Sequence, residues 1–172
     1  MKGLFFAFFT TFMLFSKVRL EDKVKIDVLF ESLCPDSRHF IKNQLYPNWK
    51  DIAPYVNLNL VPFGKSWSTE GGTKFICQHG PEECKGNKIL SCALKLLPDQ
   101  NLQVEYVNCF MRNYPKELGQ VCALEIGLNF LEVMECYNSK KGTLAQLEAE
   151  QTTVKVLPKF VPTIIYNEVS YT

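Results

Sequence analysis

The sequence lacks any cluster of basic residues, and its charges almost balance. Its 172 residues include 19 Lys and Arg against 18 Asp and Glu, a formal net charge of +1. Proteins that bind the phosphate backbone of nucleic acids normally concentrate positive charge on one surface or segment. Repeats and low-complexity segments are also absent, and 47% of the residues are hydrophobic. This composition predicts one compact domain with no nucleic-acid partner.

The sequence also lacks a hydrophobic run long enough to cross a bilayer. The longest, Leu4–Phe15, has 12 residues and follows Lys2, whereas a spanning helix needs about 20. A positive residue before a short apolar segment is typical of a secretory signal. We therefore expect a signal peptide over residues 1–19, cleaved between Ser16 and Leu20, and a single mature domain over residues 20–172. The alternatives are an N-terminal membrane anchor or a buried helix.

Cysteine is abundant, but its number is odd. Cys34 lies 43 positions before the next cysteine, and the other six fall within 60 residues. In an oxidising compartment most cysteines pair, and an odd number leaves one over. We expect three disulfides among the six and a free Cys34, with 15 connectivities open. The six are Cys77, Cys84, Cys92, Cys109, Cys122 and Cys136.

Two questions about this cysteine cluster stay open from the sequence. A zinc site built from Cys77, His79, Cys84 and Cys92 competes with disulfides, although the spacings do not match the usual zinc-binding pairs. Cys122 and Cys136 would lie about 21 Å apart on one straight helix, too far for a disulfide. However, Gly127 and a capping box starting at Asn129 allow the chain to turn between them.

Hydrophobic periodicity predicts a strand–helix–strand unit near the N-terminus. Residues 24–30 alternate and are rich in β-branched types, and Val56, Leu58 and Leu60 form a second alternating run. Between them, Pro35 suits the first position of a helix that we expect to end at Pro47. The two strands should be parallel.

The segment from about residue 66 to 150 has a different pattern. Helical spacing recurs over residues 89–97, 104–111, 116–125 and 129–137, and all six clustered cysteines fall in this segment. Strand character returns over residues 161–166, introduced by Pro162. This order of elements predicts an α/β protein with a thioredoxin-like fold that carries an inserted, disulfide-rich helical subdomain.

Cys34 is placed where such a fold carries its reactive thiol. At the end of a strand and the start of a helix, a sulfur faces unpaired N–H groups and the positive end of the helix dipole, which stabilise a thiolate. Arg38 and His39 favour the thiolate, and Asp36 opposes it. Ser37 occupies the position of a resolving cysteine; its hydroxyl can hydrogen-bond the thiolate but cannot form a disulfide. A buried, inert Cys34 is the alternative.

The segment CQHGPEECKGNKILSC, residues 77–92, resembles the signature of the gamma-interferon-inducible lysosomal thiol reductase (GILT) family. All eight fixed positions agree: Cys77, Gln78, His79, Gly80, Glu83, Cys84, Asn87 and Cys92. ESLCPDS and VPTIIYN are similar to the active-site and cis-proline segments of that family. The resemblance covers residues 24–167 and implies a disulfide reductase with Cys34 as nucleophile and a cis Pro162 beside it. A trans proline at the start of a strand is the alternative for Pro162. The resemblance implies no cofactor or metal, structural roles for the clustered cysteines, and a structural, hydrogen-bonded His79.

This chain departs from the family pattern in two places. Ser37 replaces the resolving cysteine, so dithiol turnover is expected to be lost or strongly reduced. No N-x-S/T site occurs in the sequence, which makes glycan-dependent delivery to lysosomes less expected than secretion. We expect a secreted monomer that binds other proteins, without membrane contact. The alternatives are monothiol exchange on protein disulfides using an external thiol, and a dimer linked through Cys34.

Overall fold

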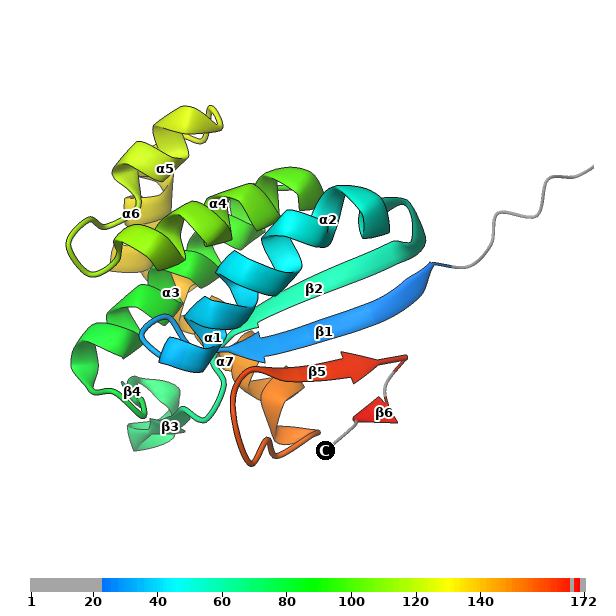
Figure 1. Cartoon of the computed structure of the whole chain (residues 1–172). Coiled ribbons are helices and arrows are strands. Elements are labelled where there is room, and N and C mark those ends of the chain that lie inside the picture. Colours follow the sequence, from blue (N-terminus) through cyan, green and yellow to red (C-terminus); the bar gives the residue numbers. More distant parts are fainter. Residues whose placement is uncertain (1–22, 168, 171–172) are drawn as a thin grey trace, which may run out of the picture.

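A computed structural model describes residues 23–167 and 169–170, so the expected signal peptide lies outside the described residues. The main sheet has four strands: β1 (Val24–Phe30), β2 (Val56–Pro62), β5 (Thr163–Tyr166) and β6 (Val169–Ser170). Their order is β2-β1-β5-β6, with β1 parallel to β2 and antiparallel to β5 (Figure 1). The predicted strand–helix–strand unit with parallel strands is therefore confirmed.

The helix after β1 runs further than predicted. It comprises α1 (Pro35–Phe40), a π-helical turn (Ile41–Leu45), α2 (Tyr46–Ile52) and a 3-10 turn (Ala53–Tyr55). The prediction that it ends at Pro47 is wrong. Proline has no N–H to donate, and its ring collides with the carbonyl four residues earlier in a regular α-helix. Here the preceding turn is widened, with the Tyr46 N–H donating to Ile41 O, so the helix passes through Pro47.

The inserted segment begins with a two-stranded sheet, which the sequence did not predict. This sheet consists of β3 (Trp67–Thr69) and β4 (Lys74–Ile76), joined by a 3-10 turn (Glu70–Gly72). Five helices follow: α3 (Pro81–Leu96), α4 (Gln100–Asn113), α5 (Gln120–Glu125), α6 (Phe130–Asn138) and α7 (Lys140–Val154). The first four match the predicted helical segments, and α7 was not predicted. No helix among the described residues is long and apolar enough to span a membrane.

The six clustered cysteines form three disulfides: Cys77–Cys84, Cys92–Cys136 and Cys109–Cys122. Cys34 is the free cysteine. With these sulfurs bonded to one another, the alternative zinc site on Cys77, Cys84 and Cys92 is ruled out. The chain turns at Gly127 (φ 72°), and the Asn129 side chain caps α6 by accepting the Leu131 N–H. Even so, Cys122 and Cys136 bond to other partners.

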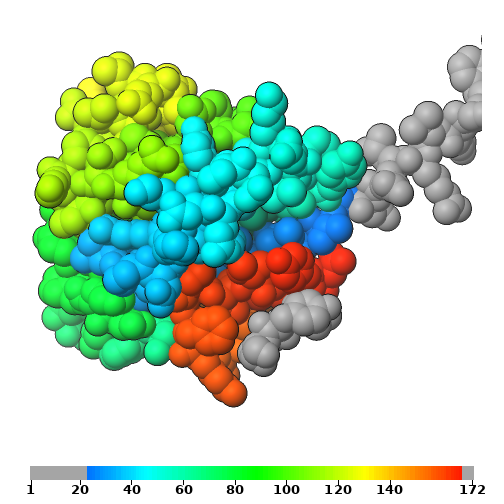
Figure 2. All heavy atoms as spheres, in the orientation of Figure 1, coloured from blue at the N-terminus to red at the C-terminus, as the bar shows by residue number. Residues whose placement is uncertain are grey.

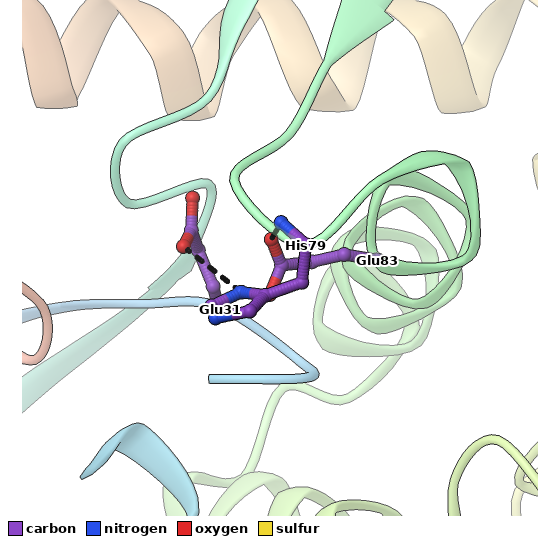
Figure 3. Close-up of side chains that lie close together, drawn as sticks. All are labelled: Glu31, His79 and Glu83. Atoms are coloured by element: carbon purple, nitrogen blue, oxygen red, sulfur yellow. Dashed lines mark hydrogen bonds and ion pairs between the residues drawn. The ribbon is translucent and has the colours of Figure 1, made fainter. Parts of the chain in front are cut away.

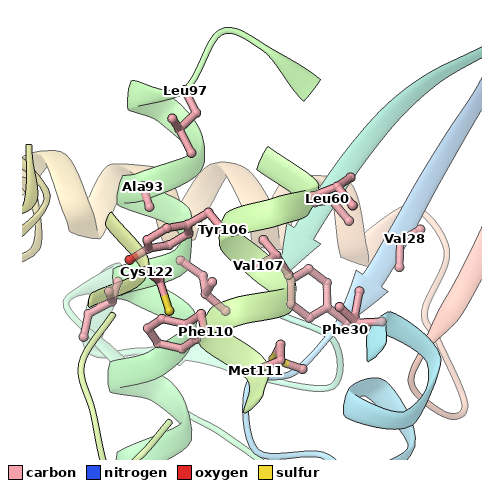
Figure 4. Packing of buried hydrophobic residues seen from close by; sticks show 14 of the residues in the cluster. Val28, Phe30, Leu60, Ala93, Leu97, Tyr106, Val107, Phe110, Met111 and Cys122 are labelled. Atoms are coloured by element: carbon pink, nitrogen blue, oxygen red, sulfur yellow. The ribbon is translucent and has the colours of Figure 1, made fainter. Parts of the chain in front are cut away.

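Helices cover both faces of the main sheet (Figure 1). On one face, Val28 and Phe30 of β1 join a large core with α3 and α4 that contains Tyr106 and Phe110 (Figure 4). On the other face, Leu29 packs with Val61 and Ile165 against Ala149 of α7 and its neighbours. Figure 2 shows the α1–α2 segment beside the β5 segment on the molecular surface. This arrangement brings the start of α1 close to the residues that precede β5.

Candidate functional site

Cys34 lies between the end of β1 and the start of α1. It is the N-terminal cap of α1, with an extended backbone (φ −62°, ψ 122°), and Pro35 and Asp36 begin the helix. The residue is 4% exposed. Its backbone N–H donates to Glu31 O at 3.3 Å, and its Sγ lies 3.6 Å from the carbonyl oxygen of Val161. The free thiol is thus held at a strand-to-helix junction with a defined neighbour from the far end of the chain.

That neighbour belongs to the segment before β5. The Val161–Pro162 peptide bond is cis, and the Val161 carbonyl faces the sulfur of Cys34. The two segments lie 127 residues apart in sequence and are joined through the pairing of β5 with β1. The structure therefore places the predicted nucleophile and the predicted cis-proline side by side.

Ser37 is fully buried one helical turn after Cys34. Its Oγ accepts a hydrogen bond from the backbone N–H of Glu31 at 3.3 Å. We expected a hydroxyl able to bond the thiolate, whereas the interaction observed for Ser37 ties α1 to the end of β1. The position of a resolving cysteine is therefore occupied by a buried serine, and the hydrogen bond of its hydroxyl is to the backbone of Glu31.

The side chains of Arg38 and His39, which we expect to favour the thiolate, have hydrogen-bond partners other than Cys34. The Arg38 guanidinium donates to two backbone carbonyls, Ser32 O at 3.0 Å and Tyr114 O. The exposed His39 ring instead pairs with the side chain of Asn43 at 3.0 Å. These contacts indicate that Arg38 fastens the loop before Cys34 to the end of α4.

The loop before Cys34 is bound by the N-terminal half of α3. The Ser32 N–H donates to Asn87 Oδ1 at 2.8 Å, the Ser32 hydroxyl donates to Glu83 O at 3.0 Å, and the Leu33 N–H donates to Glu83 Oε2 at 3.2 Å. The Ser32 side chain also packs closely against the helix backbone at Gly86, because a Cβ placed on Gly86 would lie 2.4 Å from Ser32 Oγ. One helix thus fixes both residues that precede the thiol.

A group of titratable side chains, Glu31, His79 and Glu83, lies behind this loop, with both carboxyl groups buried and the imidazole partly exposed (Figure 3). His79 donates its backbone N–H to Glu83 Oε1 at 2.8 Å, and its ring Nδ1 lies 2.7 Å from Glu83 Oε2. Glu31 Oε1 accepts the Lys65 N–H at 2.9 Å and the Ser66 hydroxyl at 3.2 Å. Glu31 Oε2 has no hydrogen-bond partner and lies 4.0 Å from His79 Nδ1.

The surroundings of Glu31 favour its protonated form. Burial, and after it the negative charge of Glu83, raises the pKa of Glu31 from 4.5 to about 7. The hydrogen bonds from Lys65 and Ser66 act in the opposite direction. Gly64, at φ +56°, passes directly over this side chain, since a Cβ there would lie 2.5 Å from Glu31 Cγ. The carboxyl is therefore sealed from solvent on the side of Gly64.

The sequence profile described as "Gamma interferon inducible lysosomal thiol reductase (GILT)" matches residues 25–126. The chain belongs to the GILT family. It is 39% identical to GILT-like protein 1 of Drosophila melanogaster over 166 residues, covering 85% of this chain and 66% of that protein. It is 33% identical to the gamma-interferon-inducible lysosomal thiol reductase of Mus musculus over 154 residues, covering 84% of this chain and 61% of that protein. The GILT chain described here thus spans about two thirds of the length of these relatives.

Solved structures support the fold assignment. The oxidoreductase DsbA from Xylella fastidiosa superposes with a TM-score of 0.61 at 17% identity, covering 88% of this chain and 76% of that one. BdbD from Bacillus subtilis gives a TM-score of 0.60 at 14% identity, covering 87% and 78%. This GILT protein therefore has a thioredoxin-like fold of the DsbA type, and it belongs to a family of thiol-disulfide oxidoreductases.

The geometry also gives the GILT signature of this chain a physical role. The sequence predicts a structural role for this segment. In the structure, the segment binds the loop that carries Cys34. The sequence identifies Glu83 and Asn87 as fixed positions of the signature but does not predict their contacts with residues 32–33. It does not identify Glu31 as a site residue. The available signal was an acidic residue directly after a predicted strand, three positions before the cysteine.

Proposed function

We propose that this GILT protein has lost most or all dithiol reductase activity, and acts mainly by binding other proteins. One observation carries the proposal: Ser37, buried and bonded to the Glu31 N–H, stands at the position of the resolving cysteine. Two further observations support the proposal: Cys34 is free, and its sulfur lies against the segment of Pro162. The scaffold is therefore that of a reductase with one reacting atom replaced.

The chemistry explains why this single atom matters. The Cys34 thiolate attacks one sulfur of a substrate disulfide, forming a mixed disulfide while the second substrate sulfur leaves as a thiolate. Release by a dithiol enzyme requires a second thiolate to attack Cys34, which oxidises the enzyme to an internal disulfide and frees the reduced substrate. The Ser37 hydroxyl cannot form that disulfide, so the reaction stops at the adduct.

The substitution Ser37→Cys tests the proposal. We expect wild-type protein to reduce a protein disulfide such as that of insulin, with dithiothreitol as electron donor, close to the uncatalysed rate. Ser37→Cys should raise turnover by about tenfold or more, because an internal thiol attacks at a high effective concentration. The double variant Cys34→Ser/Ser37→Cys should return to the background. Substantial wild-type turnover that Ser37→Cys hardly increases would refute the proposal.

Monothiol exchange is the second candidate, and the free state of Cys34 and its position at the N-terminal cap of α1 favour it. In this reaction an external thiol such as glutathione attacks the mixed disulfide, releases the substrate thiol and leaves Cys34 bound to glutathione. A second external thiol then restores Cys34 and forms oxidised glutathione. Glutathione-dependent turnover by wild type that Cys34→Ser abolishes would support exchange; no trapped adduct and no turnover would leave binding as the function.

We also propose that the protein is secreted. The apolar segment Leu4–Phe15 after Lys2 and the lack of an N-x-S/T site support this location. The disulfides of the inserted segment suit an oxidising compartment. Lysosomal delivery, which is part of the name of the mouse relative, is the alternative. Expression of the full chain in cultured animal cells, with the protein assayed in the medium and in the lysate, separates the two.

A further inference from the structure

Two carboxylates and an imidazole converge behind the Cys34 loop from three different segments. Glu31 comes from the end of β1, His79 from the turn before α3, and Glu83 from the first turn of α3 (Figure 3). One ligand atom from each residue lies within 4.8 Å of the others. Folding therefore brings together three potential metal ligands that are separated by as many as 52 positions in the sequence.

A single imidazole is the ion-pair partner of both carboxyl groups in this cluster. The side chains of Glu31 and Glu83 are both 0% exposed, and the ion pairs that they make among the described residues are with His79. The neighbouring Lys85 pairs instead with Glu82, and Lys65 contributes its backbone N–H. Buried carboxylates are normally paired or bound to a metal ion, and here a single imidazole faces two of them.

Glu31 Oε2 is a buried atom with no hydrogen-bond partner, and it lies at this cluster. It is on the side of the carboxyl group that faces His79. The other oxygen of the same group already accepts two hydrogen bonds. Buried acceptors are almost always satisfied, so this oxygen is available to an ion that the neighbouring side chains can also reach.

We propose that Glu31, His79 and Glu83 bind a divalent transition-metal ion, with Zn²⁺ as the best match to their chemistry. Zinc takes imidazole nitrogen and carboxylate oxygen ligands at about 2.0–2.2 Å. In a tetrahedral site such ligand atoms lie about 3.3 Å apart. Glu31 Oε2 and His79 Nδ1, now 4.0 Å apart, must approach each other slightly, and Nδ1 must separate from Glu83 Oε2, now at 2.7 Å. The ion replaces the proton that Nδ1 shares with Glu83.

The positions of these residues allow this adjustment. The His79 side chain is 33% exposed, in contrast to the two carboxylates, so the ion can enter from the side of His79. The Cys77–Cys84 disulfide closes the turn that carries His79, and the bond from the His79 N–H to Glu83 Oε1 holds the backbone while Oε2 binds the ion. The site needs no contribution from Cys34 and is distinct from the thiol chemistry proposed above.

Calorimetric titration of the disulfide-bonded protein with ZnCl₂ at neutral pH tests the proposal. A Cys34→Ser background removes the free thiol, and in that background we expect one saturable zinc site. Glu31→Gln and His79→Gln should each weaken binding by about tenfold or more, because each removes a ligand. The matched control is Glu82→Gln, an exposed neighbour on the same helix, which should leave the affinity unchanged. Absence of saturable binding, or equal binding by Glu31→Gln and the control, would overturn the proposal and leave a cluster that holds only protons.

Cobalt provides a second readout that does not depend on thermodynamic fitting. Co²⁺ in this site should give the visible absorption of a tetrahedral nitrogen–oxygen environment, lost in His79→Gln and kept in Glu82→Gln. His79 lies in an exposed turn, so its variant keeps the test decisive even if Glu31→Gln does not fold. A spectrum of hexaaqua cobalt in the folded Cys34→Ser protein would contradict the site. Neither measurement depends on reductase activity.

Discussion

Glu31 shows how one buried residue can set the pH dependence of stability. Its pKa is raised from 4.5 to about 7 in the folded protein, first by burial and then by Glu83. The folded chain therefore holds this proton more tightly than the unfolded chain does. The contribution of Glu31 to the free energy of unfolding is fully present below pH 4.5 and is lost as the pH rises to about 7.

This argument predicts how Glu31→Gln changes the stability. An amide has the shape of the protonated carboxyl but cannot ionise, so the variant avoids the cost of a buried charge at high pH. Relative to wild type, its free energy of unfolding should increase by roughly 3 kcal/mol between pH 4.5 and pH 8. Urea unfolding at a series of pH values, with EDTA present and disulfides intact, measures this difference. If the difference in free energy of unfolding between the two proteins were constant across that range, the raised pKa of Glu31 would be contradicted.

At the same scale, the sequence identified the thiol but not its surroundings. Cys34, Ser37 and Pro162 could be selected because a free cysteine, a missing partner and a strand-opening proline are local signals. The pairing of Glu31 with His79 could not be predicted, since 48 positions separate them and only the packing of α3 against the end of β1 joins them. The hydrogen bond from Arg38 could not be predicted for the same reason, because its acceptor Tyr114 O lies at the C-terminal end of α4.

At the scale of elements, periodicity predicted the segments whose apolar residues recur on their buried faces. The strands β1 and β2 and the helices α3 to α6 follow this rule. Helix α7 does not, because Leu144 and Val154 are more than half exposed while Gln146 is fully buried. Gln146 donates instead to Pro62 O at 3.1 Å and Ser91 Oγ at 2.7 Å. A helix anchored by a buried amide gives no hydrophobic stripe to detect, and three-residue strands such as β3 and β4 are too short to show alternation.

The close packing of α3 on the Cys34 loop leads to a prediction at Gly86. A glycine to alanine change inside a helix normally stabilises it by about 1 kcal/mol. Here the added methyl would lie 2.4 Å from Ser32 Oγ and 2.7 Å from Tyr114 Cε1, and overpacking of this kind costs about 1–3 kcal/mol. We expect Gly86→Ala to lower the free energy of unfolding and to increase the reactivity of Cys34 toward a thiol reagent, because the loop is displaced. Chemical denaturation and the labelling rate measure these effects.

The control is Lys95→Ala, whose side chain is exposed on the same helix and which should change the free energy of unfolding by less than about 0.5 kcal/mol. A Gly86→Ala variant that is more stable than wild type would contradict the packing argument.

At the scale of the whole molecule, the three disulfides connect different parts of the inserted segment and close loops of different lengths. Cys92–Cys136 joins α3, which packs against the sheet, to α6, and its ends are 44 residues apart. Cys77–Cys84 closes a local turn of 7 residues. Cys109–Cys122, with a separation of 13 residues, links α4 to α5. The insertion thus depends most on the bridge that closes the longest loop.

Chain entropy gives this ranking a magnitude. Closing a loop of 44 residues restricts the unfolded chain by about 4 kcal/mol, against about 2.4 kcal/mol for 7 residues. Cys92→Ala/Cys136→Ala should therefore reduce the free energy of unfolding by about 1.5 kcal/mol more than Cys77→Ala/Cys84→Ala. The fully buried Cys92 adds a packing loss in the same direction. Urea denaturation of the two double variants, each followed by circular dichroism, provides the comparison. If the two double variants lose equal free energy of unfolding, or if Cys77→Ala/Cys84→Ala loses more, the ranking by loop length is wrong. The Cys77–Cys84 disulfide would then stabilise the Cys34 loop as well as its own turn.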